Sequence, residues 1–431
     1  MANDARFIRA DRQQARWDML DLEGLLPSDH RARIVVDFVE RLDLSALYDS
    51  IKAREGEPGR PPADPAVLKA MWLYATIEGV GSARQLDQLA RSELAYRWIA
   101  GGVPLNYHGP ADFRVAHVEV LDRLLTESVT ALIEAGVISL SEIAVDGTKV
   151  RANAGRGSFK TSDKLLQIEA AVERRLAELK SEIENDPEAS SRRRRAARER
   201  AAREVKERAE RAREAIDKMR QEKEKRAKTH RKDEEKKSEP KASLSDPEAR
   251  NMRFADGAVR PGYNAQIAAV PKEGIIVSVD VTDRRNDTGL AGPMVDDIER
   301  RYGSAPANLL VDTKYATADD IAALAARERG PVTVYTPLPT ERDDVKPETL
   351  RKRAWERARE PDGVKEWRSR MDSAAGQEVY RRRKLIERLN AHLKNHGFGI
   401  LPIRGLVKAK AIALWHALAN NLLAAHRLAI A

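Results

Sequence analysis

The chain has 431 residues, of which 42% are hydrophobic and 34% are charged, and its formal net charge is +9. This length allows two or three domains with a sizeable core, and the basic balance favours a polyanionic partner. Because there is no cysteine, disulfides and thiolate metal sites are excluded, so a metal would need oxygen or imidazole ligands. The sequence shows neither a signal peptide nor an apolar run long enough for a bilayer, so we expect a soluble cytoplasmic protein without membrane contact.

The first 135 residues carry helical patterns. Asp64 and Pro65 stand at the N-cap and first helical positions before apolar residues at helical spacing. Ser82 and Ser92 are the expected caps of two further short helices. Short helices joined by tight turns, with arginines between them, are compatible with a helix-turn-helix DNA-binding domain and equally with any helical bundle. We predict that residues 1–135 form a helical N-terminal DNA-binding domain.

Strand patterns begin near residue 138. The apolar run 143–145 ends in Asp146 and is typical of a buried strand. After this strand, helical patterns alternate with further strand patterns along the chain. This alternation predicts a mixed α/β sheet. The later strands are expected at residues 263–270, 275–281, 308–311 and 332–335.

Residues 160–241 separate the first expected strand from the others. The segment contains no glycine and is dominated by Arg, Lys, Glu and Ala. Its apolar residues recur at three- and four-residue steps in two runs, interrupted at residues 185–187, which predicts a charged antiparallel helical hairpin with a thin apolar seam. Three roles stay open: a solvated arm, a dimerisation arm, and a non-specific grip on DNA phosphates through the four arginines at 192–195.

Three acidic residues lie where phosphoryl-transfer chemistry requires carboxylates. Asp146 and Asp312 each follow an apolar run, and Glu387 lies in a basic helical segment. Such oxygen ligands suit Mg²⁺ or Mn²⁺, and two ions roughly 3.5–4 Å apart would activate the attacking oxygen and stabilise the leaving one. Taken singly, an aspartate at a strand end is more often a turn or cap residue.

Further polar residues surround Glu387 at helical spacing. Tyr380 precedes Arg383 by three positions, Arg383 precedes Glu387 by four, and Lys394 follows Glu387 by seven. On one continuous helix these side chains would share a face. A carboxylate bordered by cations fits a metal ligand beside phosphate-binding groups, and an exposed helix with ordinary salt bridges fits the pattern equally well.

The same spacing resembles the Tyr–Arg–Glu–Lys signature of bacterial insertion-sequence DDE transposases. The N-terminal segments resemble the InsH-type N-terminal domain of these proteins. Later segments resemble the first-aspartate motif and the motifs that follow it. Only residues 160–241 lie outside the resemblance. The segments that carry it are 59–65, 74–86, 96–102, 112–114, 146–154, 245–250, 262–266, 286–287, 312–315, 404–406 and 420–423.

The resemblance implies an α/β fold: an RNase-H-like catalytic domain over residues 136–159 and 242–431 with C-terminal helices, preceded by the helical N-terminal domain and interrupted by the inserted charged hairpin. It implies metal-dependent DNA strand cleavage and strand transfer at the ends of an insertion sequence, with Mg²⁺ or Mn²⁺ as cofactor. The expected partner is double-stranded DNA, bound by a homodimer that would then be nucleoid-associated.

The resemblance also assigns roles to residues. It implies that Asp146, Asp312 and Glu387 are catalytic and bind the metal. It further implies that Tyr380, Arg383 and Lys394 contact the transposon-end DNA beside them.

One position departs from the family pattern. The second-aspartate motif usually reads Asp-Ala-Gly-Tyr, whereas here Lys314 stands in place of the glycine, two residues after Asp312. Glycine is the residue with the most permissive backbone, so the change bears on the geometry of Asp312. The alternative hypothesis is therefore a catalytically decayed or domesticated DNA-binding protein. A coiled-coil interaction protein, suggested by the basic hairpin, would have no sheet and no convergence of the three acids.

Overall fold

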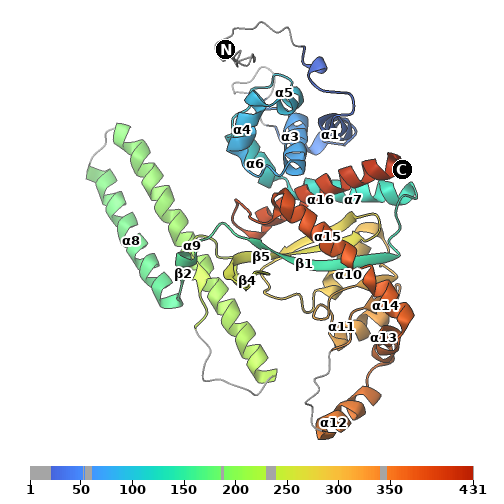
Figure 1. Cartoon of the computed structure of the whole chain (residues 1–431). Coiled ribbons are helices and arrows are strands. Elements are labelled where there is room, and N and C mark those ends of the chain that lie inside the picture. Colours follow the sequence, from blue (N-terminus) through green and yellow to red (C-terminus); the bar gives the residue numbers. More distant parts are fainter. Residues whose placement is uncertain are drawn as a thin grey trace, which may run out of the picture.

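The computed structural model of the chain describes residues 21–51, 53, 61–185, 189–229, 239–339 and 347–430. Within these ranges the protein consists of a helical N-terminal region, a mixed sheet flanked by helices, and an arm of two long helices (Figure 1). The α/β class with a helical N-terminal region is thereby confirmed. Of the helices in these ranges, none is both long and apolar enough to cross a membrane.

Short helices joined by tight turns make up the N-terminal region. Asp64 accepts a hydrogen bond from the Ala66 amide (2.8 Å) and Ser82 accepts one from the Gln85 amide (3.4 Å), which confirms both predicted N-caps. Ser92 is instead the last residue of its helix and its hydroxyl donates to a carbonyl one turn earlier (3.2 Å), so the cap predicted there is wrong. The elements are η1 (Glu23–Leu25), α1 (Arg31–Glu40), α2 (Ser45–Asp49), α3 (Pro65–Ile77), α4 (Ala83–Ser92), α5 (Leu94–Ala100), α6 (His108–Ala116) and α7 (Val118–Glu134).

The sheet is mixed and has the strand order β6-β5-β1-β7-β8, with β4 pairing to another part of β5. Strands β6, β5 and β1 are antiparallel neighbours, whereas β7 runs parallel to β1 and β8 parallel to β7. Each expected strand overlaps an observed one. Strand β1, however, continues to Arg151, so the prediction that Asp146 ends it is wrong. The strands are β1 (Glu142–Arg151), β4 (Arg250–Arg253), β5 (Val259–Val270), β6 (Ile275–Thr282), β7 (Asn308–Leu310) and β8 (Thr333–Tyr335).

Helices from the C-terminal half flank the sheet. The last of them, α16, packs against β6, α7 and α3, and α15 packs against β1. One continuous hydrophobic cluster therefore contains residues of the N-terminal helices and of the sheet. The domain boundary near residue 135 stays a prediction. The helices are α10 (Ala291–Tyr302), α11 (Ala318–Ala325), α12 (Pro347–Ala358), α13 (Asp362–Asp372), α14 (Ala374–Arg381), α15 (Lys384–Leu393) and α16 (Leu406–Ile430).

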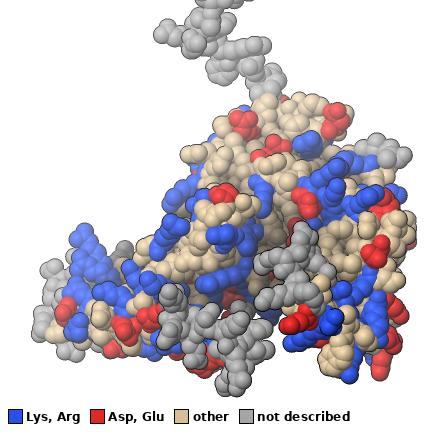
Figure 2. Space-filling model, turned by 60° about the horizontal axis from the view of Figure 1, so that its bottom comes forward, with Lys and Arg blue, Asp and Glu red and all other residues tan. Residues whose placement is uncertain are grey.

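The arm consists of α8 (Ser162–Asn185) and α9 (Ala189–Thr229), which pack against each other. At its base, β2 (Phe159–Lys160), which follows η2 (Arg156–Ser158), pairs antiparallel with β3 (Ala242–Ser243). The surface of the arm carries both signs of charge (Figure 2). Of the four arginines at 192–195, only Arg194 has a described side chain, and it is exposed. The arm has an apolar cluster of its own, formed by Leu165, Ala209, Ala212, Ile216, Met219 and Ala242.

We expect the core to fold without this arm. The cluster in the arm is separate from the main core, and the β2–β3 pair already brings the two ends of the arm together. A variant that joins Thr161 to Lys241 through a short glycine-containing turn should therefore unfold in one cooperative thermal transition. Loss of a cooperative transition, with the full-length protein unfolding normally, would show that the arm is part of the core.

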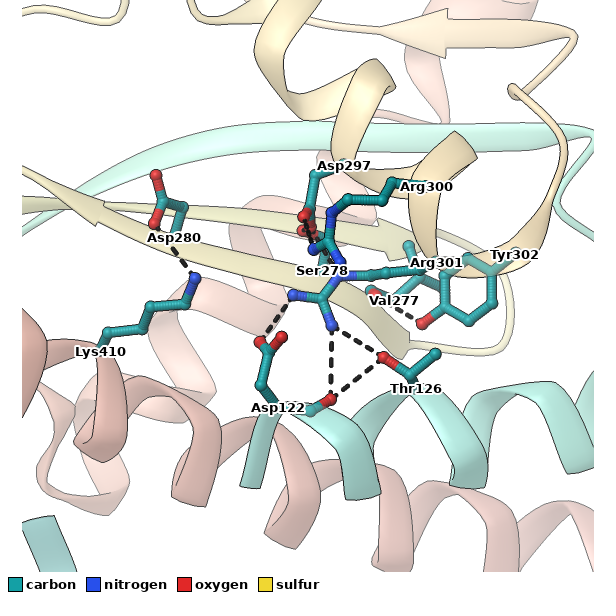
Figure 3. Close-up of polar contacts among 10 residues, drawn as sticks. All are labelled: Asp122, Thr126, Val277, Ser278, Asp280, Asp297, Arg300, Arg301, Tyr302 and Lys410. Carbon is teal, nitrogen blue, oxygen red and sulfur yellow. Dashed lines mark hydrogen bonds and ion pairs between the residues drawn. The ribbon is translucent and has the colours of Figure 1, made fainter. Parts of the chain in front are cut away.

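A buried ion network connects α7 to α10 and β6 (Figure 3). The Arg301 side chain is 1% exposed and forms ion pairs with Asp122 and Asp297, both at 2.6 Å. It also donates to Thr126 Oγ1 (2.9 Å), while Ser278 Oγ donates to Asp297 Oδ2 (2.6 Å). Since burying a charge is costly unless partners satisfy it, this network favours one docked position of α7 against α10 and β6.

Candidate active site

Asp146 lies within β1, at a place where one edge of that strand is open. Strand β7 pairs with β1 only through Ala144, whereas the pairing with β5 continues to Arg151. The Asp146 carboxylate accepts hydrogen bonds from Arg383 Nη2 and Asn390 Nδ2, both at 2.7 Å. Burial raises the pKa of Asp146, and the Arg383 charge opposes this shift. The carboxylate is therefore partly dehydrated and needs a cation beside it.

Arg383 connects Asp146 to Glu387. Its Nη1 donates to Glu387 Oε1 (2.6 Å), and the two side chains are 9% and 56% exposed. Arg383 lies at a break between α14 and α15, so the one continuous helix expected around Glu387 is two helices. Although burial lowers the pKa of Arg383, the neighbouring carboxylates, Asp146 foremost, raise it. Arg383 is therefore a fixed positive charge between two of the three predicted catalytic acids.

Asp312 follows β7 by two residues and is exposed. Its carboxylate accepts a hydrogen bond from the Thr313 amide (2.8 Å). Its carbonyl accepts bonds from the Tyr315 amide (2.9 Å) and from Thr336 Oγ1 (3.0 Å). These bonds close a turn in which Lys314 is exposed. The Asp312 charge adds to the rise that burial causes in the pKa of Tyr380, but among the described residues the ion pairs of Arg383 are with Asp146 and Glu387, not with Asp312.

Along the chain, Tyr380 precedes Glu387 of α15 and Lys394 follows it. Tyr380 belongs to α14, and burial raises the pKa of its hydroxyl. Lys394 follows α15, at the start of a short π-helical segment (Lys394–Phe398). Partial loss of hydration lowers the pKa of Lys394, and the Asp146 carboxylate opposes this shift. Both residues therefore experience the charges of the acidic cluster.

The sequence did not single out Asn390, which belongs to the site. Asn390 is 5% exposed and holds one oxygen of Asp146, while its own Oδ1 is buried without a hydrogen-bond partner. A signal was present, because Asn390 stands three positions after Glu387 and seven after Arg383. Such spacing places a side chain on the same helical face.

Asp287, noted only as part of a motif, forms a second polar network beside β1. Its Oδ1 accepts hydrogen bonds from Asn264 Nδ2 (2.7 Å) and Gln266 Nε2 (2.8 Å) on β5. The Tyr315 hydroxyl donates to Gln266 Oε1, which links this network to the turn that carries Asp312. A Cβ atom on Gly147 would lie 2.1 Å from Asp287 Oδ1. A larger residue at the position that follows Asp146 would therefore have to displace the Asp287 side chain.

We expect Gly147→Ala to lower stability by about 1–3 kcal/mol, the usual range for overpacking a buried site. The added methyl group would displace Asp287 from its two amide partners. Denaturant unfolding measures the change, and Gly155→Ala is the matched control because a Cβ there meets no atom within 4 Å. Equal stability of the two variants would show that the Asp287 network adapts without cost.

The carboxylates of Asp146 and Glu387 are suitable ligands for a hard divalent cation, but in this structure both form ion pairs with Arg383. Among the residues that the structure describes, no group of three acidic or histidine side chains lies close enough to hold one metal ion. Instead, Asp146 and Glu387 converge on one guanidinium group, which is itself a cation. Oxygen ligands of this kind suit Mg²⁺ or Mn²⁺.

Enzymes that cleave phosphodiesters commonly use acidic side chains to hold divalent metal ions. An arrangement of acids with cations beside them is compatible with such an enzyme. Family comparisons specify the class further. Residues 227–422 match the model of the transposase DDE domain, and residues 20–114 match the model of a transposase domain, DUF772. Together the two matches span more than half of the chain, which belongs to the DDE transposases of insertion sequences, a family of DNA-cleaving and DNA-joining enzymes. No curated protein and no solved structure is significantly similar to it.

Proposed function

We propose that this transposase cleaves DNA strands at the ends of an insertion sequence and joins them to target DNA. In this proposal Asp146, Asp312 and Glu387 are the catalytic and metal-binding residues. The observation that carries it is the convergence of Asp146 from β1 and Glu387 from α15 on the same cation. The strand order β6-β5-β1-β7-β8, with three antiparallel and two parallel strands, supports an RNase-H-like assignment of the core.

The reaction follows from the chemistry of phosphodiesters. Water attacks a phosphorus at the element end, and the bond that breaks leaves a 3′-hydroxyl. That hydroxyl attacks a target phosphodiester, so one P–O bond forms as another breaks and no nucleoside triphosphate is required. Mg²⁺ or Mn²⁺ held by the three carboxylates would activate the attacking oxygen and stabilise the leaving one.

The protein contributes mainly position and charge. Asn390 fixes the orientation of the Asp146 carboxylate through a 2.7 Å bond. Tyr380, Arg383 and Lys394 surround the acids and are proposed to hold the transposon-end DNA, with the aromatic ring available for stacking on a base and the cations for phosphates. Figure 2 shows Lys and Arg side chains spread over much of one face, which supports binding of double-stranded DNA. Two element ends would be held by a homodimer.

A cleavage assay tests the proposal. The full chain is incubated with Mg²⁺ or Mn²⁺ and duplex DNA that carries the sequences flanking its own gene, with shuffled ends as the control. We expect metal-dependent nicks at the element ends and joined products. Binding without any cleavage would instead support the decayed or domesticated alternative. In that case Lys314→Gly, which restores the family residue beside Asp312, tests whether Lys314 is the cause.

A further inference from the structure

Arg383 does not lie where a DNA-binding residue would be expected. Its side chain is 9% exposed, and two of its nitrogens are occupied by carboxylate oxygens. The third, Nε, is buried without a hydrogen-bond partner. Arg383 therefore satisfies Asp146 and Glu387 rather than presenting a donor pair to a ligand.

The same oxygen atoms cannot serve Arg383 and a metal ion at once. Asp146 Oδ1 and Glu387 Oε1 accept from the guanidinium at 2.7 and 2.6 Å. A divalent cation held between these carboxylates would need those lone pairs and would repel the guanidinium charge. Arg383 must therefore move before both carboxylates can bind a metal.

A DNA phosphate is a suitable new partner for the displaced side chain. Guanidinium groups bind phosphate in the same two-pronged way in which they bind carboxylate. Arg383 also lies at the junction of α14 and α15 rather than inside a continuous helix. A change of its side-chain rotamers alone would move the guanidinium group, with no change in the backbone.

We propose that Arg383 is an internal counter-ion that closes the acidic site in the free protein, and that a phosphate of bound DNA withdraws it and opens the carboxylates to Mg²⁺ or Mn²⁺. The inference rests on the proposed function, because it takes Asp146 and Glu387 as metal ligands. It adds an order of events, in which DNA binds first and the metal site forms second. By linkage, DNA must raise metal affinity by the factor by which metal raises DNA affinity.

Binding of Mn²⁺ to the full chain, followed by electron paramagnetic resonance at pH 8 without DNA, tests this mechanism. We expect Arg383→Ala to bind Mn²⁺ about tenfold or more tightly than wild type, since each tenfold corresponds to only ~1.4 kcal/mol. Arg388→Ala, which removes an exposed charge from α15, is the matched control and should behave like wild type. Thermal unfolding of each variant verifies folding, and Arg383→Gln serves as a second variant.

A duplex that carries the element end is then added. Wild type should gain Mn²⁺ affinity on binding it, whereas Arg383→Ala should not. Equal Mn²⁺ affinity of wild type and Arg383→Ala without DNA would overturn the counter-ion mechanism. The double variant Arg383→Ala, Asp146→Asn tests the proposed function by itself: Mn²⁺ binding weaker than that of Arg383→Ala keeps Asp146 as a metal ligand, whether or not the counter-ion mechanism holds. If its Mn²⁺ binding matches that of Arg383→Ala with and without DNA, Asp146 is not a ligand, and the proposed function fails together with the inference.

Discussion

Asp146→Asn, Asp312→Asn and Glu387→Gln are each expected to lower strand cleavage by at least about three orders of magnitude, or ~4 kcal/mol of barrier. Each change keeps the side-chain volume but removes a negative charge that the proposed metal site needs. DNA binding should be nearly unchanged, because phosphate contacts are spread over many Lys and Arg residues. Cleavage is measured on end DNA with saturating metal, and binding by gel mobility at one salt concentration.

Asp280→Asn is the control for these three substitutions. Asp280 lies on β6 and forms an ion pair with Lys410 (3.6 Å). The Asp280→Asn variant should cleave DNA at a rate within about twofold of the wild-type rate, because exposed ion pairs contribute little to the stability of the fold. A variant at one of the three acids that cleaves at a near-normal rate would remove that residue from the proposed site.

Local patterns in the sequence predicted much of the fold. The caps at Asp64 and Ser82 and the strands at β5 and β6 follow from neighbouring residues alone, and the structure has them. The length of β1 could not be predicted in this way. Residues beyond Asp146 are held in the strand by β5, more than a hundred positions later in the chain, and not by their own apolar pattern.

The site residues show the same limit. The spacing of Tyr380, Arg383 and Glu387 is local, and it identified the right segment. The environment of Arg383 is not local, because its partner Asp146 lies 237 positions away. A sequence pattern that is equally compatible with a DNA-facing arginine and with a buried counter-ion cannot distinguish them. The contact of Asn390 with Asp146 is equally non-local, although the spacing of Asn390 from Glu387 was a local sign that the two side chains share a helical face.

The largest stability effect is expected at Arg301. Arg301→Met keeps an unbranched apolar chain but leaves the Asp122 and Asp297 carboxylates, each 24% exposed, without their shared cation. Breaking a buried ion pair by removing one partner costs roughly 3–5 kcal/mol. Arg300→Met is the matched control: Arg300 is 63% exposed and also pairs with Asp297, so its loss should cost less than about 1 kcal/mol. Denaturant unfolding at pH 7 measures both.

The pH dependence of the stability difference between wild type and Arg301→Met shows whether lost charge pairing causes it. Although burial raises the pKa of Asp297, hydrogen bonds from Arg301 and Ser278 outweigh it and hold the pKa below its usual value. A lowered carboxyl pKa stabilises the fold above the unfolded-state pKa of about 3.9 and loses that contribution as pH falls further. The difference between wild type and Arg301→Met should therefore be constant near neutrality and shrink below about pH 4. A difference that persists unchanged to pH 3 would mean that lost packing, rather than lost charge pairing, destabilises the variant.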